Sequence, residues 1–337
     1  MADLRTTYMG LGLKNPIIAG ASALTANMDS IKRLEDAGVA ALVTKSLFEE
    51  QIQLERFKFD EDQEKDNYRH AEMITVHPHI EFAGPAEHLM WVGKTKEEVG
   101  IPVIASLNAV NRETWIDYAR QLEQTGVDAL ECNLFASPKD PDKDGATVEK
   151  EQVEIVREIK AAVSIPVSLK LSFFYTNPLN MVWRLADAGA NAFVLFNRLF
   201  EPDLDIEEKK HISPFNFSYE TDYRLSLRYT GLLEGAIAAD ICCSTGIFAG
   251  ETVVKMLLAG ASAIQTVSAV FCRGYGHIAT IIRDVEAWMD KNGYASVADF
   301  RGKLSKRHSS DPWAYIRSQY ARLLMNPDEI VKNFPTM

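Results

Sequence analysis

Short apolar runs that end in a polar side chain recur along this chain of 337 residues, and they constrain its fold more than any other feature. Eight of these runs have the length of buried strands, and nearly all are separated by segments whose apolar residues have helical spacing. A Gly or Pro precedes each run, as expected where one element stops and the next begins. The predicted strands are residues 17–22, 39–46, 102–108, 128–133, 166–171, 192–197, 241–246 and 260–266.

The predicted helices lie between these strands, and residues 4–13 form a short strand-like opening. The helices cover residues 28–37, 112–125, 147–163, 179–188, 223–239, 251–258 and 269–292, with one more in the tail at 313–325. Eight strands, nearly all separated by helices, are typical of a single (β/α)8 barrel, the α/β fold class also called a TIM barrel, and fit it better than two doubly wound sheets. We therefore expect one domain that spans residues 1–337.

Two stretches interrupt the alternation, residues 49–100 after the second strand and residues 198–222 after the sixth. The first contains a charged piece and then a piece punctuated by His, Pro and Gly. Insertions of this length at the carboxyl end of a strand are usually functional loops, so both are predicted to be lid-like.

Charge and hydropathy exclude several classes of protein. The formal net charge of -11 disfavours sequence-independent nucleic-acid binding, which needs a basic surface. No apolar run approaches the roughly 20 residues that cross a bilayer, and the first residues lack the apolar core of a signal peptide. We expect a cytoplasmic protein that binds a small molecule and neither nucleic acid nor membrane.

Four cysteines fall on or near predicted strands without the spacing of metal ligands, namely Cys132, Cys242, Cys243 and Cys272. This number is low for a secreted disulfide scaffold, so reduced and mostly buried thiols are predicted. The absence of a Cys-rich segment also disfavours an iron–sulfur centre in this sequence.

Polar residues at the ends of the predicted strands are the candidate functional groups, because chemistry in such barrels lies at the carboxyl ends of the strands. They are Ser22, Lys45, Asn108, Asn133, Lys170, Asn197 and Thr245. A lysine at a strand end can also extend to solvent, and an asparagine there can simply form a turn. Their recurrence at several strand ends favours function.

The small residues after strands seven and eight predict a phosphate site. Ser244, Thr245 and Gly246 precede a helix, and Val267 and Ser268 follow the eighth strand. Many barrels bind phosphate at this position, where backbone donors are available. The alternative interpretation is a plain tight turn.

Two lysines on separate strands allow two chemistries. Lys45 or Lys170 could be a Schiff-base nucleophile, or both could stay charged and stabilise negative charge on a flavin and its substrate. His77 and His79 would lie on one face of an extended segment, but no third ligand accompanies them and no metal site is predicted.

Residues 129–138 form the strand predicted to deliver groups to the active site. An apolar run there ends abruptly in Glu131, Cys132 and Asn133. Side chains alternate along a strand, so Cys132 is expected on the packed side and Asn133 at the open rim.

The chain resembles the dihydroorotate dehydrogenase family of FMN-dependent barrels over nearly its whole length. The resemblance rests on the order of short motifs: Asn15-Pro16, Val43-Thr-Lys-Ser46, Glu131-Cys-Asn-Leu134, Pro166-Val-Ser-Leu-Lys-Leu171, Thr245-Gly-Ile247, and Leu257-Leu-Ala-Gly-Ala-Ser-Ala-Ile-Gln265. The tail at residues 293–304 is similar to the cytosolic branch of the family.

The resemblance implies FMN at the mouth of the barrel. Its phosphate would lie on Ser244, Thr245, Gly246, Val267 and Ser268, and the remaining cofactor-binding residues would be Ala21, Ser22, Lys45, Asn108, Asn133 and Lys170. Asn133 and Asn197 would bind the substrate ring, with Lys45 close to both flavin and substrate. The reaction would move a hydride between C6 of a dihydropyrimidine and flavin N5 while a base takes the C5 proton, and a homodimer is implied.

The sequence departs from the family at the base. Family members carry Cys or Ser at the position where this chain has Ala136, so Ser137 could serve only if the loop shifts by one residue. The Asn-rich substrate loop of the family is not recognisable at 77–84, and Thr245-Gly246 replaces a double glycine. Three alternatives stay open: a flavin enzyme with another unsaturated substrate, a flavin-free Schiff-base lyase, and a non-catalytic ligand-binding barrel.

Overall fold

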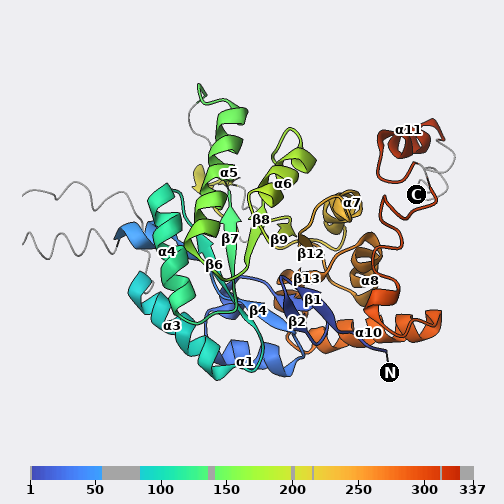
Figure 1. The fold of residues 1–337 in the computed structure, drawn as a ribbon, viewed down its shortest axis with the longest axis horizontal. Coiled ribbons are helices and arrows are strands. Elements are labelled where there is room, and N and C mark those ends of the chain that lie inside the picture. Colours follow the sequence, from blue (N-terminus) through green and yellow to red (C-terminus); the bar gives the residue numbers. More distant parts are fainter. Residues whose placement is uncertain are drawn as a thin grey trace, which may run out of the picture.

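Eight parallel strands close into a barrel in the computed structural model, which describes residues 2–54, 84–135, 141–198, 202–214, 216–311 and 313–326 (Figure 1). The strands are β3 (Ile17–Ala19), β4 (Ala41–Val43), β6 (Val103–Asn108), β7 (Ala129–Leu134), β8 (Val167–Leu171), β9 (Ala192–Leu195), β12 (Asp240–Cys243) and β13 (Ala263–Thr266). The sheet closes because β4 pairs with both β3 and β6. This confirms the predicted (β/α)8 barrel.

Helices surround the barrel and connect its strands (Figure 1). They are α1 (Met28–Asp36), α3 (Pro85–Glu98), α4 (Arg112–Gln124), α5 (Gly145–Ala162), α6 (Pro178–Asp187), α7 (Tyr223–Leu233), α8 (Gly250–Ala259), α9 (Ser268–Arg273) and α10 (His277–Asn292). Each predicted strand overlaps an observed one, and the predicted helices before residue 223 agree with the observed ones within two residues at most ends.

Alternation along the strands divides the buried residues into two layers. On β7, Leu130, Cys132 and Leu134 belong to the large cluster between the barrel and its helices, whereas Ala129 belongs to a smaller cluster inside the barrel. Glu131 lies on the same inner side, two residues further along, and only 1% of its surface is exposed. The interior therefore changes from apolar to polar as the strands approach their carboxyl ends.

A hairpin before the first barrel strand closes the other end of the barrel. It pairs β1 (Thr6–Tyr8) with β2 (Leu11–Leu13), and its Tyr8, Met9 and Leu13 join the inner apolar cluster. Tyr8 is fully buried. Small side chains on the strands, such as Ala41, Ala129 and Ala263, leave room for these larger ones.

The first predicted insertion contains an ordinary helix of the barrel. Within residues 49–100, residues 49–54 are helical and α3 occupies Pro85–Glu98, where it contacts α4 and β6. Residues 55–83 lie outside the described residues. The boundaries predicted for this insertion were therefore too wide, since they included α3. The helix was not recognised in the sequence because its apolar pattern is weak, with Met90 exposed and Val92 buried.

The structure corrects three other predicted elements. The helix expected at 269–292 is divided into α9 and α10, because Gly274 takes a positive φ of 80° between them. The helix expected at 223–239 ends at Leu233, two residues before Gly235 with φ of 71°. The tail helix α11 begins later than expected and spans Arg317–Met325.

The second predicted insertion, 198–222, contains an antiparallel hairpin in its described part. Strands β10 (Asp203–Asp205) and β11 (Lys210–Ile212) pair with each other and not with the barrel. Most of their residues are exposed, including Leu204 at 60%.

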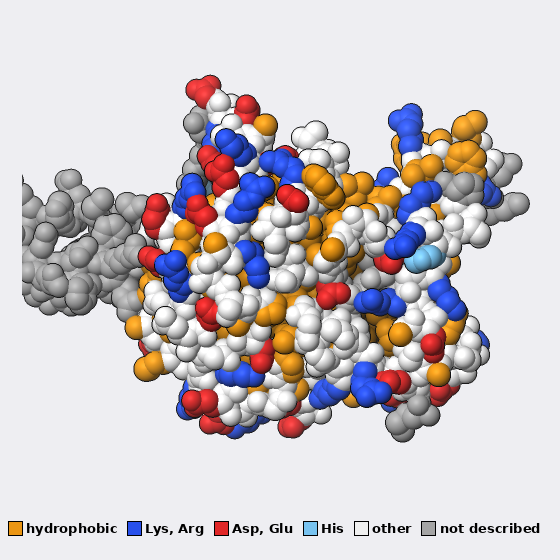
Figure 2. Space-filling model, in the orientation of Figure 1, with side chains coloured by type: hydrophobic (Ala, Val, Ile, Leu, Met, Phe, Trp, Pro, Cys, Tyr) orange, Lys and Arg blue, Asp and Glu red, His pale blue; other side chains and the backbone are white. Residues whose placement is uncertain are grey.

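The surface shows acidic and basic side chains interspersed over α4 and α5 (Figure 2). Several form exposed ion pairs, such as the one between Lys143 and Glu151. None of the described helices has both the length and the apolar character to cross a membrane. Cys132, Cys242 and Cys243 are buried, which confirms the prediction of mostly buried thiols, and Cys272 is exposed on α9, the short helix after β13.

Candidate functional site

A cavity of about 490 Å³ lies at the carboxyl ends of the barrel strands. It is lined by twelve of the thirteen residues singled out from the sequence: Ala21, Ser22, Lys45, Asn108, Asn133, Lys170, Asn197, Ser244, Thr245, Gly246, Val267 and Ser268. The thirteenth, Ser137, lies outside the described residues, as do Ala136, His77 and His79. Residues from the ends of all eight barrel strands thus converge, because parallel strands end at the same rim.

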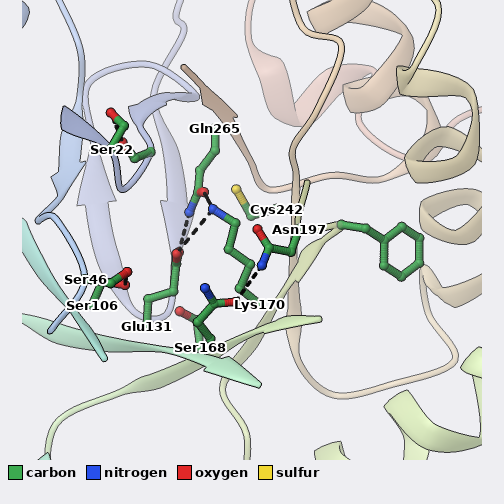
Figure 3. A network of polar contacts seen from close by, with 12 residues as sticks. Ser22, Ser46, Ser106, Glu131, Ser168, Lys170, Asn197, Cys242 and Gln265 are labelled. Atoms are coloured by element: carbon green, nitrogen blue, oxygen red, sulfur yellow. Dashed lines mark hydrogen bonds and ion pairs between the residues drawn. The ribbon is translucent and has the colours of Figure 1, made fainter. Parts of the chain in front are cut away.

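Three buried polar side chains form the floor of this cavity (Figure 3). Lys170 Nζ donates a hydrogen bond of 3.1 Å to Gln265 Oε1, and Gln265 Nε2 donates to Glu131 Oε2. Glu131 Oε1 lies 3.7 Å from Lys170 Nζ. The three residues come from β8, β13 and β7, so this network crosses the interior of the barrel.

Two asparagines meet beside this floor. Asn197 Nδ2 donates a hydrogen bond of 2.9 Å to Asn133 Oδ1 (Figure 3). Asn133 is also paired in register with Lys170 on the neighbouring strand. The contact fixes the orientation of both amides and leaves Asn133 Nδ2 and Asn197 Oδ1 as a donor and an acceptor for a ligand.

Lys45 lies on another side of the cavity, after β4. Partial burial lowers the pKa of its ammonium group from the ordinary value. His88 on α3 is only 8% exposed, and burial together with the charge of Lys45 lowers the pKa of its imidazole to about 4. His88 is therefore neutral near pH 7, and Lys45 is the cation that this side offers to a ligand.

The segment after β12 turns sharply at the cavity wall. Thr245 and Gly246 have positive φ angles of 73° and 76°, and Thr245 Oγ1 donates to the carbonyl of Phe196. A Cβ atom on Gly246 would lie 2.5 Å from the backbone nitrogen of Tyr223. Only glycine fits this position, and successive backbone N–H groups in such turns can form concave anion sites.

Aromatic side chains form part of the cavity wall. Phe48 and Phe135 line it and are 38% and 39% exposed, and Phe217 lines it as well. Apolar faces of this kind can contact a planar ring and exclude water from it.

Arg198 also lines the cavity but its charge is already compensated. Its guanidinium lies 2.7 Å from the carboxylate of Asp222 and donates to Asn216. No motif or strand-end pattern selected Arg198, Phe135 or Phe217 as a site residue. Gln265 was visible only as part of a family motif. Glu131 was noted at the polar end of the active-site strand, on the same face as Asn133, but was not selected as a site residue.

The described part of the chain contains no cluster of three or more His, Cys, Asp or Glu that could hold a metal ion. A flavin mononucleotide, in contrast, matches the groups present. The cavity has the size of a cofactor site, its floor carries the cation of Lys170, and small residues line the side predicted for phosphate. Glu131 Oε1 is buried and has no hydrogen-bond partner among the described residues, so this oxygen at the floor could accept a hydrogen bond from a bound ligand.

Comparison with known proteins identifies relatives of the chain. The family model described as dihydroorotate dehydrogenase matches residues 84–289, more than half of the sequence. The chain is 28% identical over 316 residues to the dihydroorotate dehydrogenase B (NAD(+)) catalytic subunit of Thermoplasma acidophilum. This match covers 90% of this chain and 99% of the relative. The chain is 21% identical over 329 residues to the chloroplastic dihydropyrimidine dehydrogenase (NADP(+)) of Arabidopsis thaliana, covering 89% and 76% respectively.

Proposed function

The chain belongs to the dihydroorotate dehydrogenase family, and on that premise we propose that it binds FMN and exchanges a hydride between the flavin and the C5–C6 bond of a dihydropyrimidine. Family membership makes it an oxidoreductase that acts on CH–CH groups. The observation that carries the rest of the proposal is the convergence of the predicted residues on one cavity with Lys170 in its floor.

Bound FMN would supply N5 as the hydride acceptor or donor. Lys170 and Lys45 provide positive charge at the cavity surface, where negative charge develops during such a reaction. Asn133 and Asn197 are held by their mutual hydrogen bond and would orient the pyrimidine ring. Ser137 remains our candidate for the base that takes the C5 proton, and its test is the Ser137→Ala variant, whose kcat should fall by about 10²-fold or more while FMN stays bound.

The turn after β12 and the residues after β13 would hold the phosphate. Thr245 and Gly246 would supply backbone N–H groups beside Val267 and Ser268 on the same cavity wall, whereas the N–H of Ser244 already donates to the carbonyl of Leu195, so Ser244 would contribute its side chain. The left-handed backbone of Thr245 supports a binding role, because this conformation is costly for a residue other than glycine and persists where the surrounding structure requires it.

Visible absorption spectroscopy tests the cofactor. The purified protein, reconstituted with FMN and freed of excess by gel filtration, should retain about one flavin per chain and show the flavin absorption bands. A chain that stays colourless at high FMN concentration would disprove the proposal. Anaerobic addition of dihydroorotate should then bleach the bound flavin if that compound is a substrate.

A neutral dihydropyrimidine is a second candidate substrate. A carboxylate such as that of dihydroorotate is favoured by a nearby cation, but two of the cations that line the cavity already face carboxylates, since Arg198 is paired with Asp222 and Lys170 with Glu131. The aromatic wall, which includes Phe135, favours an uncharged ring instead. The relative in Arabidopsis thaliana is named a dihydropyrimidine dehydrogenase. Faster flavin bleaching by dihydrouracil or dihydrothymine than by dihydroorotate would support this candidate.

The Schiff-base alternative receives less support. Lys170 Nζ is engaged by Gln265 Oε1 and faces the carboxylate of Glu131, so it is held in place by these contacts and is not presented as an unengaged nucleophile. Lys45 has the lowered pKa that such chemistry needs, yet the family is one of oxidoreductases.

Assembly is also a proposal. The first relatives are named catalytic subunits, and we infer that this chain works as a homodimer or with a partner subunit that passes electrons. Sedimentation of the purified chain at several concentrations would distinguish a stable homodimer from a monomer.

A further inference from the structure

Glu131 is a buried carboxylate with an unusual set of contacts. Only 1% of its surface is exposed, yet one oxygen receives a hydrogen bond from Gln265 and the other receives none from the described residues. The nearest cation is Lys170 Nζ, 3.7 Å from the second oxygen. A buried carboxylate without compensation is costly, so Lys170 is the group that allows Glu131 to stay in the barrel.

Gln265 connects the two charged groups and restricts their geometry. Its Oε1 accepts from Lys170 and its Nε2 donates to Glu131, so the amide can take only one orientation. A flipped amide would direct its NH₂ group at the ammonium and its oxygen at the carboxylate. The lysine is thereby held against the floor of the cavity by two residues from opposite sides of the barrel (Figure 3).

The net charge of the floor follows from this arrangement. Lys170 and Glu131 together are neutral, although Lys170 lines the same cavity that is proposed to hold the flavin. In the weakly polarisable interior, a nearby carboxylate cancels much of the field that an ammonium exerts on a bound group. A flavin gains negative charge when it is reduced, so its reduction is sensitive to this balance.

We propose that Glu131 is a positioning residue that fixes Lys170 with the help of Gln265 and limits how strongly the site stabilises negative charge on the flavin. This inference rests on the proposed FMN binding. It adds that Glu131 adjusts the reactivity of the bound flavin. Glu131 acts through Lys170 and needs no contact with the substrate.

Sulfite provides a probe, because its sulfur forms a bond to N5 of oxidised flavins and leaves the adduct negatively charged. The FMN-loaded Glu131→Gln variant has nearly the same shape but no charge at this position. It should bind sulfite at least tenfold more tightly than the wild type, because at an effective dielectric of about 20 an uncompensated charge as far as about 12 Å away already changes a binding constant about tenfold. The midpoint potential of the flavin should rise by about 30 mV, which is a tenfold change for a two-electron couple.

Two further variants separate charge from shape. Glu131→Asp keeps the charge and should remain near the wild-type sulfite affinity, whereas Lys170→Met should bind sulfite about tenfold more weakly, again as a unit charge would require. Because Glu131 is proposed to act through Lys170, its replacement should have no further effect once Lys170 is absent, so the double variant should match Lys170→Met alone. This last comparison tests the inference even where Glu131→Gln alone does not fold.

Glu49→Gln is a matched control for loss of a buried carboxylate. Glu49 is 2% exposed and accepts hydrogen bonds from Asn111 and Thr114, but it does not line the cavity. The control should lower the melting temperature without changing sulfite binding.

The outcomes decide between the two levels of the proposal. A wild-type chain that takes up no FMN overturns both the proposed cofactor and this inference. FMN-loaded Glu131→Gln with wild-type sulfite affinity and midpoint potential overturns only the inference, and so does a double variant that differs tenfold from Lys170→Met. A lower melting temperature with unchanged flavin properties would assign Glu131 a purely structural role.

Discussion

Asn197 at the end of β9 donates a hydrogen bond of 2.9 Å to Asn133 near the end of β7, across the intervening strand β8. The contact joins two positions that are 64 residues apart in the sequence. It makes the two amides a single recognition unit at the cavity wall, since the orientation of one determines that of the other.

Loss of this contact should weaken substrate binding. In the Asn197→Ala variant, Asn133 Oδ1 loses its partner, and we expect kcat/KM to fall about tenfold to 100-fold because one or two hydrogen bonds to the ring are lost. FMN content should stay near that of the wild type. Asn292→Ala, at an exposed helix end, is the control and should leave kcat/KM unchanged. Steady-state kinetics with equal activity in both variants would remove Asn197 from the substrate site.

Gly246→Ala should damage the predicted phosphate site. Its Cβ would meet the backbone of Tyr223 at 2.5 Å, so the turn has to move, and we expect FMN affinity to fall by about tenfold or more. The left-handed conformation adds a stability cost of roughly 1–3 kcal/mol. Fluorescence titration of FMN measures the affinity.

Gly126→Ala separates strain from crowding. Gly126 also has a positive φ, 83°, but nothing lies within 4 Å of its Cβ position. This variant should lose a similar amount of stability and keep the FMN affinity. Equal FMN affinities for both variants would argue that the turn at Gly246 does not touch the phosphate.

His88 should make the fold sensitive to acid. Its pKa falls from 6.5 in the unfolded chain to about 4 in the folded one, because the imidazole is buried and close to Lys45. Between these values only the unfolded state binds the proton, so stability falls as the pH decreases from about 6.5 to about 4, by about 3 kcal/mol in total. His88→Gln should remove this part of the loss, measured by urea unfolding at about pH 7 and about pH 4.5.

An exposed histidine serves as the control for this pH dependence. His211 on β11 is exposed, and His211→Gln should leave the acid sensitivity of the wild type unchanged. Identical losses of stability in the wild type and His88→Gln between the two pH values would contradict the expectation.

Thiol reactivity should distinguish one cysteine from the other three. Burial raises the pKa of the Cys132 and Cys243 thiols to about 12 and that of Cys242 well above its ordinary value, so none of them forms the reactive thiolate near neutral pH. Cys272 is exposed. A chromogenic disulfide reagent should therefore modify one thiol in the native protein and four after unfolding, and Cys272→Ser should abolish the native reaction.

The strand order and the residues at the strand ends could be predicted because their signals are local. An apolar run such as 129–134 ends in Asn133, and a glycine or proline precedes each strand. Closure of the barrel then brings Lys45, Lys170 and Asn197 to the same rim without further information from the sequence.

Contacts across the barrel could not be predicted in the same way. Gln265 and Glu131 are 134 residues apart, and only the closed sheet brings them together. The helix boundary at Gly274 was missed because glycine is tolerated inside helices, so its positive φ becomes visible only in the structure. The insertion predicted at 49–100 wrongly included α3, because exposed Met90 obscured the amphipathic pattern of this helix.

The hairpin of β1 and β2 has a consequence for the order of events in turnover. Tyr8, Met9 and Leu13 fill the barrel from the end opposite the cavity, so within the described residues small molecules reach the floor at Lys170 from the cavity at the strand ends. A small reductant and a small oxidant would then bind in the same cavity one after the other, and the first product would dissociate before the second reactant binds. This ping-pong order of binding gives parallel lines in double-reciprocal plots of the two-substrate kinetics.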